Sequence, residues 1–219
     1  MSEYIVIGLG TFGRSLAGEL QSLGNEVLGI DIDRAEVQTL SGSIRQVIEA
    51  DATSEETLRE LGVANLDGAV VAIGGTEASI MATLLLKKIG LPYVIARATS
   101  ELHEEILKLV GANRVVFPER EMASRLAHQI GVPEVVDYLS ISTDMGISKL
   151  VVPNHLVGMT SREADIEERF KVRIIAMIRS DRVIFGTSTT ERFEPRDVLI
   201  VSGIDKDLAE LSNYARSDS

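Results

Sequence analysis

The residues best suited to chemistry near the start of this chain are three glycines spaced as Gly-x-Gly-x-x-Gly. Gly8, Gly10 and Gly13 follow an apolar run typical of a strand and precede a segment with helical periodicity. In this setting the first glycine permits a tight turn, the second lets a phosphate approach the backbone, and the third lets helix and strand pack closely. The loop, with Thr11 and Phe12, predicts a phosphate site at a helix N-terminus. The alternative is a tight turn without a ligand.

Acidic side chains follow the second apolar run, residues 26–30. Asp31 stands directly after that run and eighteen positions after Gly13, close to the ~20-residue separation at which an acid binds the ribose hydroxyl groups of a dinucleotide. Its carboxylate would repel a 2′-phosphate, which disfavours NADP. Asp33 has two interpretations, a contact with the ligand or the cap of the following helix.

Further candidates for the ligand side of the sheet follow the later apolar runs. Asp51, Ala52 and Thr53 come after residues 46–50, where an adenine ring would lie, or else they start the next helix. Two more candidate cofactor-binding residues are Ile73, which ends the run at 69–73, and Gly74, which follows it.

A basic residue, Arg97, ends the run at 93–97 on the expected ligand side. Its guanidinium group could meet a phosphate, or it could pair with an acid such as Glu101 or Glu119. The sequence alone slightly favours the ion pair.

Residue patterns of known catalytic machinery do not accompany this site. Neither Tyr93 nor Tyr138 is followed four positions later by Lys, and the three histidines stand in no zinc-binding spacing. A nucleophile elbow and a Walker-type phosphate loop are also absent. The sequence therefore predicts a binding module rather than an enzyme. The alternative is an NAD-dependent oxidoreductase, for which His128 or Lys149 would have to be recruited.

The elements that must position these residues alternate between strand and helix, which predicts an α/β, doubly wound parallel sheet of Rossmann type. We expect six strands, at residues 4–7, 26–30, 46–50, 69–73, 93–97 and 114–117. Helices are expected at 12–23, from a capping box at Thr53–Glu56, and at 76–89, 101–110 and 119–130. The predicted nucleotide-binding domain spans residues 1–135.

The rhythm changes after residue 135, and residues 136–219 predict a small α+β domain. We expect short strands at 137–142, 149–152, 173–178, 183–185 and 198–201, with a hairpin around Ser180-Asp181. A second capping box, Thr160 to Glu163, predicts a helix that runs to Phe170, and a last helix is expected at 205–211.

Composition narrows the class of protein. The 219 residues are 45% hydrophobic and 25% charged, as in a globular protein, and the net charge is −11. Such an acidic surface disfavours nucleic acid and anionic lipid as direct partners. No apolar run approaches the ~18–20 residues that cross a bilayer, no signal peptide is evident, and cysteine is absent. We expect a cytoplasmic location.

Together these motifs resemble one family, the cytosolic regulatory subunits of Ktr- and Trk-type bacterial potassium uptake systems, built from RCK domains. The resemblance covers nearly the whole chain. It is carried by the loop Gly8–Gly13, Asp31, and the segments 50–53, 117–122 and 197–203.

The resemblance implies a gating subunit that binds ATP or ADP, or else NAD or NADH, in its first lobe. It implies a homodimer whose helix near 122–130 crosses to the neighbour, and an octameric ring beneath a potassium-conducting membrane subunit at the inner face of the plasma membrane. By position, Asp31 would bind ribose, Asp51 and Thr53 the adenosine side, and Arg97 phosphate. Glu119 would help hold Mg²⁺ or Ca²⁺, or it is only an acid favoured by its helix N-terminus.

This chain departs from the family pattern at two positions. Several Ktr-type subunits have Arg where this chain has Thr11, so a strong preference for ATP over ADP loses its support. Relatives that bind cyclic di-AMP have Arg where this chain has Glu167, so that ligand is not expected. A nucleotide sensor of another transporter remains an alternative.

Overall fold

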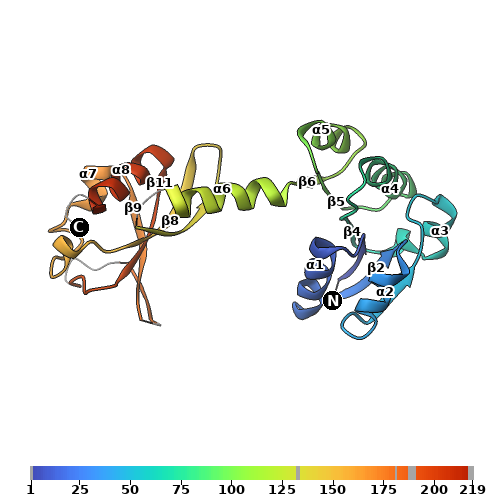
Figure 1. Cartoon of the computed structure of the whole chain (residues 1–219), viewed down its shortest axis with the longest axis horizontal. Coiled ribbons are helices and arrows are strands. Elements are labelled where there is room, and N and C mark those ends of the chain that lie inside the picture. Colours follow the sequence, from blue (N-terminus) through green and yellow to red (C-terminus); the bar gives the residue numbers. More distant parts are fainter. Residues whose placement is uncertain (1, 132–133, 181, 187–190, 217–219) are drawn as a thin grey trace. The chain divides into compact units, whose positions relative to one another are not determined.

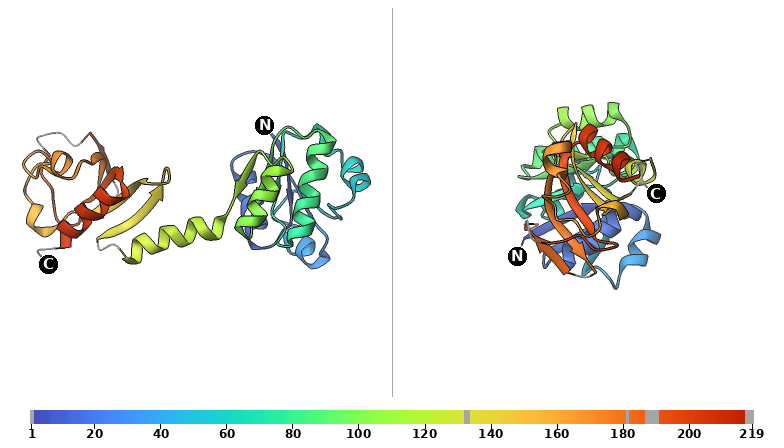
Figure 2. Two further views of the ribbon diagram at one scale, coloured as in Figure 1. Left: turned by 90° about the horizontal axis from the view of Figure 1, so that it is seen from above. Right: turned by 90° about the vertical axis from the view of Figure 1, so that its left-hand side faces the viewer.

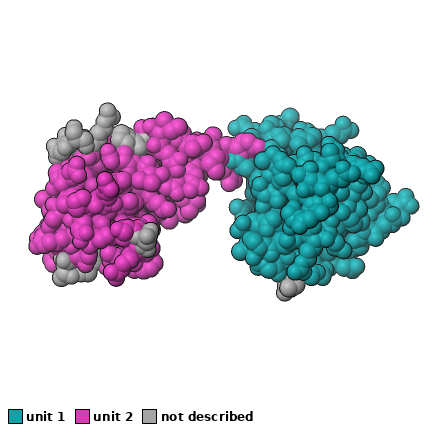
Figure 3. Space-filling model, turned by 60° about the horizontal axis from the view of Figure 1, so that its bottom comes forward, with its two compact units in different colours: residues 1–118 teal, residues 119–219 magenta. Residues whose placement is uncertain are grey.

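The computed structural model describes residues 2–131, 134–180, 182–186 and 191–216, and the chain forms two compact units. These units are residues 1–118 and 119–219 (Figure 3). The boundary expected from the sequence lies at 135/136, and the difference is one helix, α6 (Pro118–Gly131), which groups with the second unit. Within that unit, Arg125 of α6 makes a bidentate contact with Asp137, and His128 of α6 stacks on Tyr138.

The first unit is built on a six-stranded parallel sheet with the order β3-β2-β1-β4-β5-β6. This order confirms the predicted doubly wound sheet, and it reverses direction between β1 and β4, where ligands bind in such folds. The strands are β1 (Glu3–Ile7), β2 (Glu26–Asp31), β3 (Gln46–Glu49), β4 (Gly68–Val71), β5 (Val94–Arg97) and β6 (Arg114–Val116).

Helices cover both faces of this sheet (Figure 1). Side chains alternate along β1, so Ile5 and Ile7 belong to one buried cluster and Val6 to another. The Val6 cluster includes residues of α1 (Thr11–Ser22) and α2 (Arg34–Leu40). The opposite cluster includes residues of α3 (Glu55–Glu60), α4 (Thr76–Ile89) and α5 (Glu101–Leu109). A short 3-10 helix, η1 (Val63–Asn65), leads into β4.

The second unit contains a five-stranded antiparallel sheet with the order β10-β9-β11-β8-β7, which confirms the predicted small α+β fold. Helix α8 lies along it (Figure 2). Asp181, at the predicted hairpin turn, lies outside the described residues, but β9 and β10 pair as expected. The elements are β7 (Val135–Ser140), β8 (Met145–Val151), η2 (Asn154–Leu156), α7 (Ile166–Phe170), β9 (Arg173–Arg179), β10 (Arg182–Phe185), β11 (Val198–Ile204) and α8 (Asp205–Arg216).

At both capping boxes expected from the sequence, the start of the helix differs from the prediction. Ser54 rather than Thr53 caps α3, through a 3.3 Å hydrogen bond from the Thr57 N–H to Ser54 Oγ. Thr160 and Glu163 do exchange the two hydrogen bonds of a capping box, at 2.9 and 3.1 Å. The predicted helix start there is nevertheless wrong, because left-handed backbone at Asp165 (φ 50°) delays α7 until Ile166.

An ion pair ties α6 to the sheet of the second unit and predicts a pH effect. The Arg125 guanidinium donates two 2.7 Å hydrogen bonds to Asp137, and this lowers the pKa of that carboxyl from 3.8 to about 2. An acid whose pKa is lower in the folded state than in the unfolded state stabilises the fold at pH values above its unfolded-state pKa. This stabilisation is lost as the pH falls through the folded-state pKa. Asp137→Asn should therefore melt about 2–4 °C below wild type near pH 7. The gap should narrow as the pH falls below about 4 and close only below the folded-state pKa of about 2, and a gap of unchanged size near pH 2 would contradict this origin.

No helix in the described part of the chain is both long and apolar enough to cross a membrane.

Candidate functional site

The glycine loop has the geometry that its spacing predicts. Gly8 has a positive φ of 90°. A Cβ at Gly13 would lie 1.8 Å from the Gly8 carbonyl oxygen, so only glycine lets α1 approach β1 this closely. A Cβ at Gly10 would meet no protein atom within 4 Å. The fold itself does not require glycine there, so the open space fits the approach of a ligand phosphate.

Asp31 ends β2 and ties the glycine loop to it. Asp31 Oδ2 accepts a 2.6 Å hydrogen bond from the Leu9 N–H, and Oδ1 accepts a 2.8 Å bond from the Asp33 N–H. Each carboxylate oxygen has a second acceptor position. Asp31 can therefore hold the loop and still accept a hydrogen bond from a ribose hydroxyl group.

The neighbouring acids have local structural roles as well. Asp33 Oδ1 accepts a 2.8 Å hydrogen bond from the Ala35 N–H, so the capping interpretation of Asp33 is confirmed. Asp51 Oδ1 accepts from both the hydroxyl group (2.7 Å) and the N–H (2.8 Å) of Thr53. These two bonds, the hydroxyl bond first, lower the pKa of Asp51, which is therefore a carboxylate at neutral pH.

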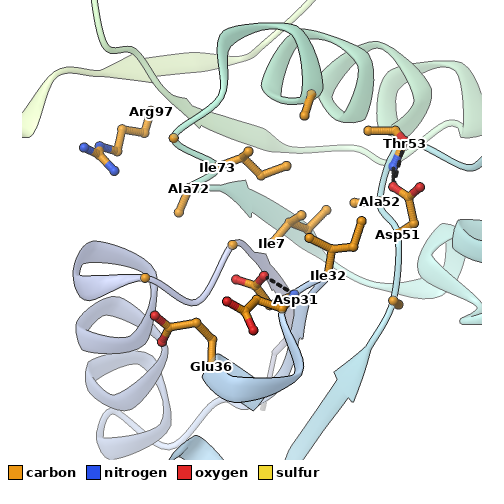
Figure 4. Close-up of a pocket in the computed structure, with 16 residues that line it drawn as sticks. Ile7, Asp31, Ile32, Glu36, Asp51, Ala52, Thr53, Ala72, Ile73 and Arg97 are labelled. Atoms are coloured by element: carbon orange, nitrogen blue, oxygen red, sulfur yellow. Dashed lines mark hydrogen bonds between the residues drawn. The ribbon is translucent and has the colours of Figure 1, made fainter. Parts of the chain in front are cut away.

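These side chains surround a cavity of about 570 Å³ at the carboxyl ends of the strands (Figure 4). That volume lies within the ~300–1,000 Å³ of small-molecule and cofactor sites. Of the expected cofactor-binding residues, ten line it: Gly8, Gly10, Asp31, Asp33, Asp51, Ala52, Thr53, Ile73, Gly74 and Arg97.

Three expected residues lie outside the lining. Gly13 is buried behind the loop, and Thr11 and Phe12 are in the first turn of α1. The Arg97 guanidinium carbon lies 5.8 Å from the centre of the Phe12 ring, a cation–π distance that positions Arg97 at the cavity.

The lining also includes residues that we did not select from the sequence: Ile7, Ile32, Glu36, Ala50, Ala72 and Ala78. Ile32 is 70% exposed, which leaves an apolar surface against which a base could pack. Glu36 stands in the first turn of α2. The one sequence signal for Glu36 was its position in a helix expected to start just after Asp31, the candidate ribose-binding acid.

Two helix N-termini provide anion-binding groups at this cavity. The N-caps of α1 and α4 are Gly10 and Gly75, and neither offers a side chain that caps the helix. Gly74 and Ala78, on either side of the α4 cap, line the cavity. Helix N–H groups without a side-chain acceptor can bind phosphate oxygens.

The histidines of the chain do not line this cavity. Among the described lining residues there is no His, Lys, Ser, Cys or Tyr. His103 is buried on α5, where its Nδ1 accepts a 3.3 Å hydrogen bond from the Thr99 N–H, and burial lowers its pKa. His128 and His155 belong to the second unit. The ionisable side chains that line the cavity are four acids and Arg97, and the acids are Asp31, Asp33, Glu36 and Asp51.

Glu119, the expected metal ligand, lies in the first turn of α6. In the described part of the chain, no group of three or more His, Cys, Asp or Glu residues could hold a metal ion. Any cation at Glu119 would need most of its ligands from water or from phosphate oxygens, as hydrated Mg²⁺ does.

Comparison with protein families decides the assignment of the chain. Residues 4–118 match the TrkA-N domain, and residues 147–216 match the TrkA-C domain. The chain belongs to the TrkA family. It is 37% identical over 208 residues to the Ktr system potassium uptake protein C of Bacillus subtilis (strain 168), with 94% of each chain covered. It is 31% identical over 208 residues to the Ktr system potassium uptake protein A of Vibrio alginolyticus, again with 94% of each chain covered.

Solved structures share the fold of this TrkA-family chain. The GsuK RCK domain matches all of it with a TM-score of 0.70 at 19% identity, and the chain spans 48% of that structure's length. The GsuK channel bound to NAD matches 98% of the chain, which covers 39% of that structure, with a TM-score of 0.69 at 19% identity. GsuK bound to ADP matches 59% of the chain, which covers 34% of that structure, with a TM-score of 0.52 at 24% identity.

Proposed function

We propose that this chain is the nucleotide-binding regulatory subunit of a potassium uptake system and has no catalytic activity of its own. The observation that carries the proposal is the cavity at the carboxyl ends of the strands, where Gly10 leaves open space and Asp31 retains free acceptor positions. Its described lining provides binding groups and contains no His, Lys, Ser, Cys or Tyr. A regulatory subunit needs no more than a ligand that binds one conformational state better than another.

The ligand we propose is an adenine nucleotide, ATP or ADP first and NAD or NADH second. Its ribose would contact Asp31, and its adenosine side would lie near Asp51 and Thr53. Its phosphates would lie at the N-terminus of α1 and near Arg97. The NAD and ADP named in the GsuK structures support this ligand class. We propose that Glu119, through water, helps hold Mg²⁺ or Ca²⁺ at the phosphates.

Assembly forms the second part of the proposal. Met122, Leu126 and Ile130 recur every four residues along α6 and are 49%, 46% and 85% exposed, so they form an apolar stripe that a second subunit would cover. We propose that α6 functions with the nucleotide-binding domain, residues 1–135, and crosses to a neighbour in a homodimer.

The membrane context completes the proposal. Pairs would form an octameric ring on the cytoplasmic face of the plasma membrane, against a potassium-conducting subunit. The relatives named as Ktr system potassium uptake proteins support that partner.

Calorimetry tests the proposal, with ATP, ADP, NAD and NADH each titrated with and without Mg²⁺ or Ca²⁺. We expect micromolar binding of at least one nucleotide, about −8 kcal/mol. Asp31→Ala should abolish that binding. The matched control is Asp67→Ala, which also removes a carboxylate that accepts a backbone N–H, from Glu3 at 2.8 Å, but away from the cavity. Asp67→Ala should leave binding intact.

Two results would overturn the proposed function. One is the absence of binding for all four nucleotides. The other is nicotinamide-dependent turnover of a substrate, which would make the protein an oxidoreductase. Sedimentation at micromolar concentration tests the assembly separately, because a monomer with and without nucleotide would contradict the proposed ring.

A further inference from the structure

A second carboxylate, that of Glu36, lines the cavity near Asp31, at the edge where we propose that the ribose binds. We call this the ribose edge. Glu36 makes fewer hydrogen bonds within the protein than Asp31 does. Both oxygens of Asp31 already accept backbone N–H groups, at 2.6 and 2.8 Å. Its first role is thus to hold the glycine loop and the β2–α2 turn. Each oxygen of Asp31 has one acceptor position left for a ligand. Other side chains at this edge can therefore contribute to the choice between nucleotides with and without a 2′-phosphate.

Glu36 lies across the cavity edge from α1. Glu36 lines the same cavity as Asp31, and Figure 4 shows its carboxylate turned toward the helix at the left of the view. It pairs with Arg14 of α1, where the Nη1–Oε2 distance is 3.5 Å and the side chains are 37% and 33% exposed. A pair this long and this exposed is weak, about 0–1 kcal/mol. It does not serve chiefly to stabilise the fold, and a ligand can compete for either partner.

We propose that Glu36 sets the specificity of the cavity against nucleotides with a 2′-phosphate, and that it does so partly by neutralising Arg14. The inference rests on the proposed function, since it concerns the same nucleotide site. The Glu36 carboxylate accepts a hydrogen bond from a free ribose hydroxyl group and repels a phosphate at that position. Arg14 is the nearby cation that would otherwise attract that phosphate.

Loss of the Glu36 charge should act twice on a 2′-phosphate. It removes a like charge from the ribose edge, and it leaves the charge of Arg14 uncompensated. Both changes favour NADP over NAD, while a glutamine at this position can still accept a hydrogen bond from a hydroxyl group. We therefore expect Glu36→Gln to lower the Kd ratio of NADP to NAD by about tenfold or more, with NAD affinity nearly unchanged.

Calorimetry with NAD and NADP on the full chain tests this inference in four proteins. They are wild type, Glu36→Gln, Glu36→Gln combined with Arg14→Gln, and Glu56→Gln. Glu56 is the matched control, because it is an exposed acid in the first turn of α3 that does not line the cavity. The ratio should shift in Glu36→Gln, stay at the wild-type value in Glu56→Gln, and shift less in the double variant than in Glu36→Gln.

The outcomes separate the two proposals. Wild type that binds NAD but does not discriminate against NADP overturns this inference and leaves the proposed function standing. So does a Glu36→Gln variant that binds NAD with the wild-type ratio. A shift that persists in full in the double variant overturns the role of Arg14. Wild type that binds neither these dinucleotides nor ATP or ADP overturns the proposed function and this inference together.

Discussion

Gly13→Ala should prevent the first unit from folding stably and abolish nucleotide binding. The added Cβ would lie 1.8 Å from the oxygen and 2.9 Å from the carbon of the Gly8 carbonyl group. Both are backbone atoms, so relief requires α1 to move away from β1. That movement would also disrupt the buried cluster that contains Val6, Leu9 and Ala17. We expect a loss of more than about 4 kcal/mol, at the severe end for single substitutions, measured by urea unfolding of the first unit.

Gly10→Ala should have the opposite combination of effects. Gly10 has φ −60°, which alanine adopts readily, and a Cβ there would meet no protein atom within 4 Å. The folded state should therefore be as stable as wild type or slightly more so. Nucleotide affinity should nevertheless fall by about a hundredfold, because the methyl group occupies the space where a phosphate approaches the loop.

Gly18→Ala is the control for both substitutions. Gly18 is an exposed position of the same helix with open space around it, so alanine should stabilise the unit by about 0.5–1 kcal/mol without affecting binding. If Gly10→Ala binds nucleotides as wild type does, the phosphates do not lie at this loop. If Gly13→Ala unfolds no more readily than Gly18→Ala, the close packing of helix and strand is not essential.

The sequence could predict the first unit well because its signals are local. The bounds expected for the helix at 76–89 agree with those of α4 at both ends. This helix ends at Gly90, whose φ of 98° is one that glycine adopts at little cost. Strand β4 is buried throughout, as expected for an apolar run in the centre of a parallel sheet. The spacing of the glycines and Asp31 likewise indicated which parts of the chain meet at the cavity.

The helix starts and the role of Glu36 were harder to predict, because the same residues can form more than one set of contacts and the sequence does not show which set forms. Asp51 binds the Thr53 hydroxyl group, which leaves the capping of α3 to Ser54. The bonds of the Thr160 capping box form as expected, yet the helix does not follow them directly. Glu36 was missed because an acid in a first helical turn has an ordinary explanation in the helix dipole. Only the three-dimensional structure shows that this side chain lines the cavity.

Asp197→Ala should strongly destabilise the second unit. The Asp197 side chain is 1% exposed and accepts hydrogen bonds from Arg179 Nε (3.0 Å), Arg179 Nη2 (2.8 Å) and the Glu194 N–H (2.8 Å). Its carboxylate is the leading cause that raises the pKa of Arg179 above its ordinary range. Without that carboxylate, the Glu194 N–H loses its acceptor, and the Arg179 guanidinium group keeps only its contacts with the more exposed Glu191 and Glu194 and with the Arg192 carbonyl oxygen. Removal of one member of a buried ion pair costs about 3–5 kcal/mol.

Glu191→Gln is the matched control, because Glu191 pairs with the same guanidinium group at 2.9 Å from a more exposed position. Its loss should cost less than about 1 kcal/mol, as for other solvent-screened pairs. Urea unfolding followed by circular dichroism measures both variants. Equal effects would contradict the view that burial of Asp197 makes its contact the important one.

The Asp197 variant also tests whether the two units fold independently. Each unit has buried clusters of its own, and the contacts of Asp197 all lie in the second unit. Asp197→Ala should therefore lower the unfolding transition of the second unit, while the first unit still binds nucleotide with the wild-type Kd. Assembly that depends on the second unit should weaken in parallel, as measured by sedimentation. Loss of nucleotide binding in this variant would contradict the independent folding of the two units.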